Sequence, residues 1–129
     1  MSEGERPRVG SVLWHDLTVP DAGAVRDFYE GVVGWGAQPV EMEGYSDFAM
    51  SLPGSDEVVA GICHARGPNA DIPPQWLIYI IVEDVHASAA RCAEMGGEVV
   101  TGPRSLDGAR FCVIRDPAGA ISALYQPAE

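Results

Sequence analysis

A repeat within the chain constrains its fold more than any other feature of the sequence. An Asp, a helical pattern of apolar residues and a terminal Gly are shared by the stretches "VPDAGAVRDFYEGVVGW" and "VEDVHASAARCAEMGGE". Asp21 corresponds to Asp84 and Gly34 to Gly97, both at an offset of 63 residues, which is close to half of the chain. The sequence therefore predicts two equivalent modules.

Each module is predicted to contain one strand, one helix and three further strands. Each first strand leads into an Asp suited to cap a helix, and each helix has apolar residues at helical spacing and ends near a glycine. Module one spans about 11–64, module two about 75–126, and the linker of about 65–74 is rich in Pro, Gly and Asn. The expected strands are 11–19, 37–42, 46–52, 57–64, 75–82, 98–101, 110–115 and 120–126.

Composition and charge limit the class of protein. A chain of 129 residues with 47% hydrophobic content can bury one core, so residues 1–129 are expected to form a single domain. The sequence has no run of about 20 apolar residues and no apolar segment near its polar start, which predicts a cytoplasmic protein without a membrane span. The formal net charge of −11 argues against nucleic acid as a partner and favours a cationic ligand over an anionic one. Three cysteines without CxxC spacing predict buried thiols rather than disulfides or a zinc site: Cys63, Cys92 and Cys112.

The repeated strand, helix and three-strand unit resembles the vicinal oxygen chelate superfamily, which includes glyoxalases, extradiol dioxygenases and bleomycin-resistance proteins. The stretches "FYEGVVGW" at the first helix and "DPAG" before the last strand carry this resemblance. It implies an α+β fold in which two tandem βαβββ modules curl their mixed sheet into a cup, with helices outside and the ligand inside. It also implies a homodimer, and the exposed edges of two curled sheets agree with that expectation.

The resemblance further implies a divalent metal held by His, Gln or Glu side chains at four places in the cup. The first-strand places lie seven residues before the Asp that opens each helix, which gives Trp14 and Leu77. The last-strand place of module two lies four residues after the Gly of "DPAG", at Ala123, and the offset of 63 residues carries it back to Ala60 in module one. None of these side chains supplies the nitrogen or oxygen ligands that such ions require. We therefore expect no metal and no other cofactor.

His15 is the residue on which this alignment depends. A shift of one residue would place His15 in the cup with Gln126 beside it, and a metal-dependent enzyme would then be expected. Side-chain alternation along "VLWHDLTV" favours the other register, in which Trp14 lies in the cup and His15 is a packed or edge histidine. Its face is shared by Leu13, Leu17 and Val19, which are expected to pack against Phe28 and Val32 of the helix.

The same alternation predicts an aromatic, mostly apolar cup. Asp16 stands in the middle of a strand, where a buried carboxylate needs a partner, water or a cationic ligand, and Arg110 is the candidate protein partner. The alternative is that the aromatic side chains only fill the interior. The predicted ligand-binding residues are Trp14, Asp16, Thr18, Phe48, Met50, Leu77, Tyr79, Arg110 and Tyr125.

Three functions fit these observations. The first is a protein that holds a small organic molecule between aromatic walls without a metal, resembling the bleomycin-resistance group. The second is a metal-independent isomerase, cyclase or hydratase on the same cup, in which Asp16 or Tyr79 moves a proton. The third, a metal-dependent glyoxalase or dioxygenase, requires the shifted alignment. We take the first as the main hypothesis, although the residues of the first two overlap and the sequence barely separates them. Turnover of a ligand would distinguish the two.

Overall fold

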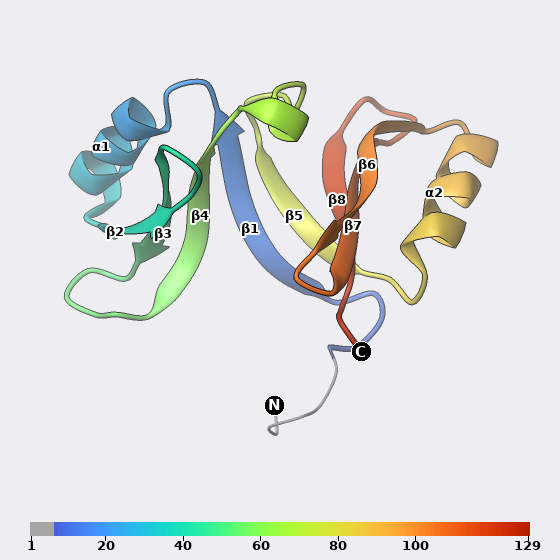
Figure 1. The fold of residues 1–129 in the computed structure, drawn as a ribbon, viewed down its shortest axis with the longest axis horizontal. Coiled ribbons are helices and arrows are strands. Elements are labelled where there is room, and N and C mark those ends of the chain that lie inside the picture. Colours follow the sequence, from blue (N-terminus) through green and yellow to red (C-terminus); the bar gives the residue numbers. More distant parts are fainter. Residues whose placement is uncertain (1–6) are drawn as a thin grey trace. The chain divides into compact units, whose positions relative to one another are not determined.

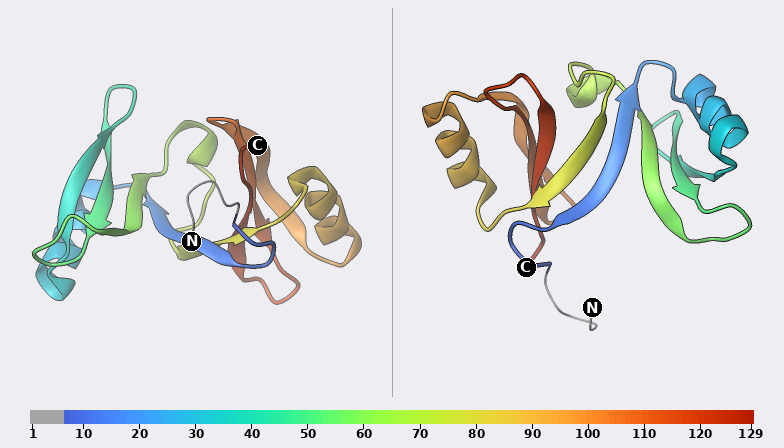
Figure 2. Two further views of the ribbon diagram at one scale, coloured as in Figure 1. Left: turned by 90° about the horizontal axis from the view of Figure 1, so that it is seen from below. Right: turned by 180° about the vertical axis from the view of Figure 1, so that it is seen from behind.

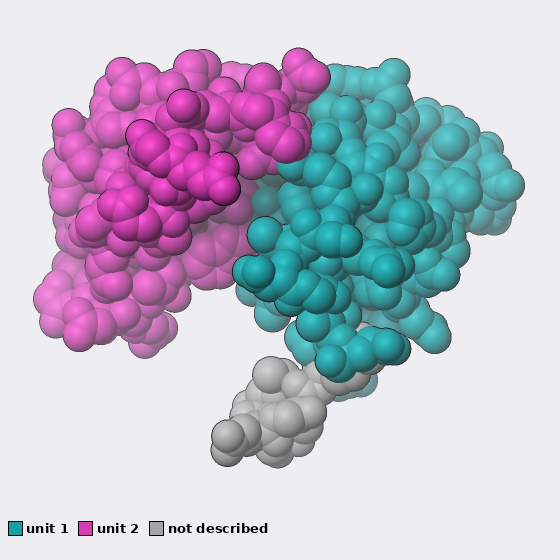
Figure 3. Space-filling model, in the orientation of Figure 1, with its two compact units in different colours: residues 1–13, 77–129 teal, residues 14–76 magenta. Residues whose placement is uncertain are grey.

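The computed structural model describes residues 7–129 and confirms the α+β class, because each half of the chain forms a strand, a helix and three further strands (Figure 1). The chain divides into two compact units (Figure 3). Unit 2 is Trp14–Trp76, and unit 1 contains residues 7–13 together with Leu77–Glu129. No helix of residues 7–129 is both long and apolar enough to cross a membrane.

Unit 2 forms a four-stranded sheet in the order β2-β3-β4-β1. Strand β1 runs parallel to β4, and the other neighbours are antiparallel. The elements are β1 (Val12–Val19, of which the first two residues belong to unit 1), α1 (Ala22–Val33), β2 (Gly36–Glu41), β3 (Ser46–Ser51) and β4 (Val58–His64). A short 3-10 helix, Gly67–Asn69, lies in the predicted linker.

Helix α1 begins and ends where the sequence predicts. The Asp21 carboxylate accepts a hydrogen bond from the Ala24 amide at 3.0 Å, and Gly34 ends the helix with a φ of 86°, a conformation that favours glycine. The helix lies along one face of its sheet, where apolar side chains of α1 and the sheet form the core of unit 2. This core contains Leu17, Val19, Ala22, Phe48, Met50, Ala60 and Ile62.

Unit 1 repeats the arrangement with the strand order β5-β8-β7-β6, in which β5 is parallel to β8. Its core beneath α2 contains Val85, Ala89, Cys112 and Leu124. Figure 2 shows from two further directions that each helix lies along its own sheet. The elements are β5 (Trp76–Ile81, of which the first residue belongs to unit 2), α2 (Val85–Glu94), β6 (Glu98–Leu106), β7 (Ala109–Arg115) and β8 (Ile121–Gln126).

The strand β6 differs most from the expectation. The sequence predicts a strand at 98–101, because Gly102 and Pro103 normally interrupt strands. In the structure the strand continues to Leu106, and its pairing with β7 shifts register twice between Val99 and Arg104. These irregularities let the ladder continue past the two residues, and they bring Arg104 opposite Phe111.

Candidate functional site

Each sheet has a helix face, which packs against α1 or α2, and an opposite face, which we call the open face. Successive strand residues point to opposite faces, so the core residues fix the direction of their neighbours. In β1, Leu17 and Val19 belong to the helix-side core, which places Trp14, Asp16 and Thr18 on the open face of unit 2.

The open face of unit 1 carries three aromatic rings at strand positions. The ring centroids of Tyr79 and Phe111 are 6.5 Å apart, and those of Tyr79 and Tyr125 are also 6.5 Å apart with an angle of 67° between the planes. All three side chains are partly exposed. We call Tyr79, Phe111 and Tyr125 the aromatic triad.

The aromatic triad stands among buried apolar side chains on the same strands. Each ring has a neighbour two residues away on its own strand that points to the same face, and these neighbours are almost completely buried. They are Leu77 and Ile81 beside Tyr79, Val113 beside Phe111, and Ala123 beside Tyr125. The backbone and packing therefore hold the rings in place. Partly exposed rings on a rigid base are suited to stacking with a flat ligand.

Arg104 also lies beside the aromatic triad, although the sequence pattern does not indicate it. Its guanidinium carbon is 4.6 Å from the centroid of the Phe111 ring. Burial lowers the pKa of Arg104, and the electrostatic influence of Tyr79 acts in the opposite direction, so the two side chains lie within electrostatic reach. The stretch "TGPRSLDG" looks like a turn, and only its pairing with β7 reveals that Arg104 belongs to this face.

The open face of unit 2 carries Trp14 and the buried carboxylate of Asp16. A Cβ atom built on Gly61 would lie 3.5 Å from the Trp14 ring and 3.2 Å from the Asp16 Cβ atom. The indole therefore lies over Gly61, where a Cβ atom would touch the ring at van der Waals distance and crowd Asp16. Thr18, two residues further along β1, is also buried.

A second group of polar side chains extends this face around Cys63. Burial raises the pKa of the Cys63 thiol, and the carboxylates of Asp16 and Asp47 raise it further. Asp47 accepts a hydrogen bond from the backbone amide of His64 at 2.9 Å, and its carboxylate lies 3.3 Å from Nδ1 of the same residue. Asp47 thus lies near both Cys63 and His64, and Asp16 acts on Cys63 through electrostatics.

Phe48 and Met50 lie on the helix face, so the expectation that they line the ligand site is wrong. Phe48 pairs with Ile62 and Met50 with Ala60, and all four belong to the core beneath α1. The guanidinium of Arg26 on α1 lies 4.6 Å from the Phe48 centroid. Alternation along β3 separates two faces but does not say which one meets the helix, and the pairing with β4 decides it.

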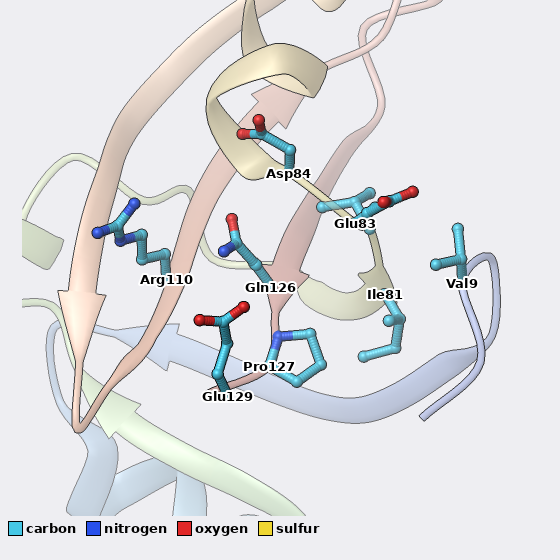
Figure 4. A pocket seen from close by; sticks show the side chains of 9 residues that line it. Val9, Ile81, Glu83, Asp84, Arg110, Gln126, Pro127 and Glu129 are labelled. Atoms are coloured by element: carbon cyan, nitrogen blue, oxygen red, sulfur yellow. The ribbon is translucent and has the colours of Figure 1, made fainter. Parts of the chain in front are cut away.

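Arg110 also lies away from the aromatic triad. It precedes Cys112 by two residues on β7 and therefore shares the helix face of unit 1. Figure 4 shows it beside Gln126 and Asp84 in a pocket of about 470 Å³ near the start of α2. Arg110 therefore does not lie on the open face of unit 1, where the sequence-based set placed it.

His15 and Gln126 do not occupy open-face positions either. His15 is exposed on the face of Leu17, so it is an edge rather than a packed histidine. Phe28 and Val32 are 57% and 66% exposed, so the expectation that they pack against this face of β1 is wrong. The Oε1 atom of Gln126 accepts a hydrogen bond from the Val85 amide at 2.9 Å, at the start of α2. This contact orients Gln126 toward the helix side of its sheet.

The residues at the expected metal places do not fit a metal ion. Asp16 pairs with Gly61 in unit 2, and its counterpart Tyr79 pairs with Ala123 in unit 1. The counterpart of Ala123 is therefore Gly61, and the assignment of Ala60 from the offset of 63 residues is wrong by one. Ala123 and Gly61 have no side-chain atom that could bind a metal ion. The same holds for Leu77 and for Trp14, whose indole nitrogen carries a hydrogen and has no lone pair to give. Among residues 7–129 no three His, Cys, Asp or Glu side chains are grouped so as to hold an ion.

Comparison with known proteins identifies relatives of different lengths. The chain is 32% identical over 120 residues to "Putative glyoxylase CFP32" of Mycobacterium tuberculosis, which covers 92% of this chain and 45% of that protein. It is also 32% identical to the anthracycline biosynthesis protein DnrV of Streptomyces peucetius, with coverage of 91% and 47%. The chain therefore spans about half the length of these curated relatives.

Solved structures share the fold at low sequence identity. Methylmalonyl-CoA epimerase from Mycobacterium tuberculosis aligns with a TM-score of 0.55 and 17% identity, covering 97% of this chain and 93% of that chain. A superfamily member from Vibrio splendidus aligns with a TM-score of 0.57 and 14% identity, covering 91% and 100%. The sequence itself matches the superfamily over residues 8–121, and the chain belongs to the glyoxalase/bleomycin resistance protein/dioxygenase superfamily.

Proposed function

We propose that this chain binds a flat aromatic organic molecule without a metal ion and that the aromatic triad is its main contact surface. The observation that carries the proposal is the placement of Tyr79, Phe111 and Tyr125 on the open face of unit 1, partly exposed over buried neighbours. Stacking on such rings buries apolar surface at little cost in side-chain entropy, because the strands already hold the rings.

The open face of unit 2 is a second contact surface, which substitution of Trp14 tests separately. Trp14 presents an indole there, and Asp16 presents a buried carboxylate that orients a polar group of the ligand. Two further residues predicted to bind the ligand also have open-face positions, Thr18 in unit 2 and Leu77 in unit 1, and both are buried. A few polar groups among apolar walls are typical of small-molecule sites.

The relatives support an aromatic natural product as the ligand class. DnrV and the related DauV of Streptomyces sp. are named anthracycline biosynthesis proteins, and anthracyclines contain fused flat rings. These relatives are about twice as long as this chain, so their function is carried over only as part of this proposal.

Calorimetric titration with 9,10-anthraquinone-2-carboxamide, a flat three-ring molecule without charge, tests the proposal. Tyr125→Ala removes one ring of the triad and is expected to weaken binding about tenfold. Phe28→Ala removes an exposed ring from α1 and serves as the control that leaves affinity unchanged. Absence of binding to the wild-type protein, or about one divalent ion per purified chain by elemental analysis, would contradict the proposal.

A second candidate function is a metal-independent enzyme that moves a proton between two atoms of its substrate. The group of Asp16, Cys63, Asp47 and His64 favours it, because a carboxylate among buried groups and an Asp–His pair are suited to accept and return a proton. Mass spectrometry and proton NMR of the ligand after incubation in D₂O report such exchange. If it occurs, Asp16→Asn should abolish exchange and retain binding.

A further inference from the structure

Arg104 lies beside the proposed binding surface. Within residues 7–129 guanidinium groups lie over aromatic rings at several places, namely Arg26 over Phe48, Arg66 over Tyr45 and Arg104 over Phe111. Of these three rings, Phe111 is the one that belongs to the aromatic triad, on the same face as Tyr79. The position of Arg104 therefore brings a positive charge to the edge of the aromatic triad.

The strands determine this position. Arg104 is directly opposite Phe111 in the pairing of β6 with β7, and Phe111 is directly opposite Tyr125 in the pairing of β7 with β8. Three neighbouring strands thus place the guanidinium and two rings in one row across the open face. Because the guanidinium lies over the Phe111 ring, a ligand that stacks on Tyr79 or Tyr125 would meet Arg104 with its edge.

We propose that Arg104 selects ligands that carry an anionic oxygen group, such as a carboxylate or a phenolate, at the edge of a flat aromatic ring. The guanidinium pairs with the oxygen atoms while the ring lies on the aromatic triad. This inference rests on the proposed function and names the substrate class of the same site. It reverses the expectation from the net charge of −11, which favours a cationic ligand.

The chemistry of the Arg104 side chain favours an anionic ligand at this site, although the net charge of the whole chain favours a cationic one. A guanidinium keeps its charge at neutral pH even where burial lowers its pKa, and it offers two parallel N–H donors to a carboxylate. Charges on the outer surface are screened by salt over about 10 Å, whereas a partly buried contact is screened much less. At this site a guanidinium in direct contact with the ligand therefore acts more strongly than exposed charges more than about 10 Å away.

A matched pair of probes tests the proposal: 9,10-anthraquinone-2-carboxylate and 9,10-anthraquinone-2-carboxamide, which share the rings and differ in charge. Wild-type protein is expected to bind the carboxylate about tenfold more tightly than the carboxamide. In Arg104→Met the carboxylate should lose about tenfold in affinity, while the carboxamide changes by less than about twofold. Arg104→Lys keeps the charge without the two-pronged donor and should lose about threefold for the carboxylate alone.

Arg110→Met is the matched control, because it removes the same charge from the neighbouring strand on the helix face. It should leave both affinities unchanged. Equal affinity for the two probes in the wild-type protein, or an equal loss for both in Arg104→Met, would overturn the role of Arg104 and leave the proposed function intact. Failure of both probes to bind the wild-type protein would instead reject the proposed function and this inference together.

Discussion

Trp14 and His15 are neighbours in β1, yet their surroundings differ completely. The ring of Trp14 lies against Gly61 on the open face, while His15 is exposed on the other face. Alternation along the sequence predicts that the two side chains point in opposite directions, and the structure confirms it. It does not predict the exposure of His15, since exposure depends on where α1 crosses the sheet.

Alanine substitutions at these two positions separate the faces. Trp14→Ala is expected to weaken binding of the anthraquinone carboxamide by about 1 to 3 kcal/mol, if the open face of unit 2 contacts the ligand, since a large apolar surface is lost. His15→Ala should change the free energy of unfolding by less than about 0.5 kcal/mol, as for other exposed side chains. Calorimetry and urea unfolding measure the two quantities. Loss of binding in His15→Ala alone would restore the shifted alignment.

The buried thiol of Cys112 makes stability depend on pH. Burial raises its pKa from 9.0 to about 11, with a smaller contribution from Cys92. The folded chain thus keeps the thiol proton to a higher pH than the unfolded chain does. The resulting stability is fully present below pH 9.0 and is lost as the pH rises toward about 11.

Urea unfolding between about pH 8 and 10 measures this loss. The contribution of Cys112 should fall by up to about 1.4 kcal/mol per pH unit above its unfolded pKa. Cys112→Ala should reduce the slope, because the variant has no thiol to titrate at this position. Cys63 has a raised pKa as well, so part of the slope should remain. Identical slopes for both proteins would refute the assignment.

At the scale of elements, the repeat in the sequence predicts the order of strands and helices correctly. Asp and Gly at the ends of the helices act through local backbone contacts, so their effect is visible in the sequence. The faces of β3, β6 and β7 were not predictable in the same way. Phe48 and Arg110 were assigned to the wrong face and Arg104 was missed, because register with a partner strand and the irregular pairing of β6 decide their direction.

The two helix caps are counterparts in the repeat but differ in their contacts. The Asp84 carboxylate accepts hydrogen bonds from the amides of His86 and Ala87, at 3.0 and 3.2 Å, whereas Asp21 accepts one from Ala24. Asp84→Ala is therefore expected to cost about 1 to 2 kcal/mol of stability and Asp21→Ala about 0.5 to 1 kcal/mol.

Urea unfolding of the two alanine variants measures this difference. Replacement of each Asp by Asn keeps an acceptor oxygen and should restore most of the stability. A larger loss for Asp21→Ala than for Asp84→Ala would contradict the role of the paired bonds.

At the scale of the whole molecule, the outer strands are poorly suited to pair with another chain. β2 and β6 end the strand orders of their units, and they carry Pro39 and Pro103. A proline has no amide hydrogen for a ladder and is common on edges that must not associate. The sequence-based expectation of a homodimer rested on exposed sheet edges, and these prolines weaken that argument. The exposed apolar side chains of α1 support a homodimer better.

Phe28 and Val32 are four residues apart on α1, so they form one exposed apolar surface. We predict that a second copy of the chain covers this surface, which would give sedimentation at about twice 13.7 kDa at micromolar concentration. Val32→Glu places a charge in that contact and should yield the 13.7 kDa species with an unchanged circular dichroism spectrum. Leu106→Glu, on the outer strand β6, is the matched control and should leave the larger species intact. A wild-type protein that sediments as the monomer would refute the dimer, and dissociation by Leu106→Glu alone would move the contact from α1 to the edge of β6.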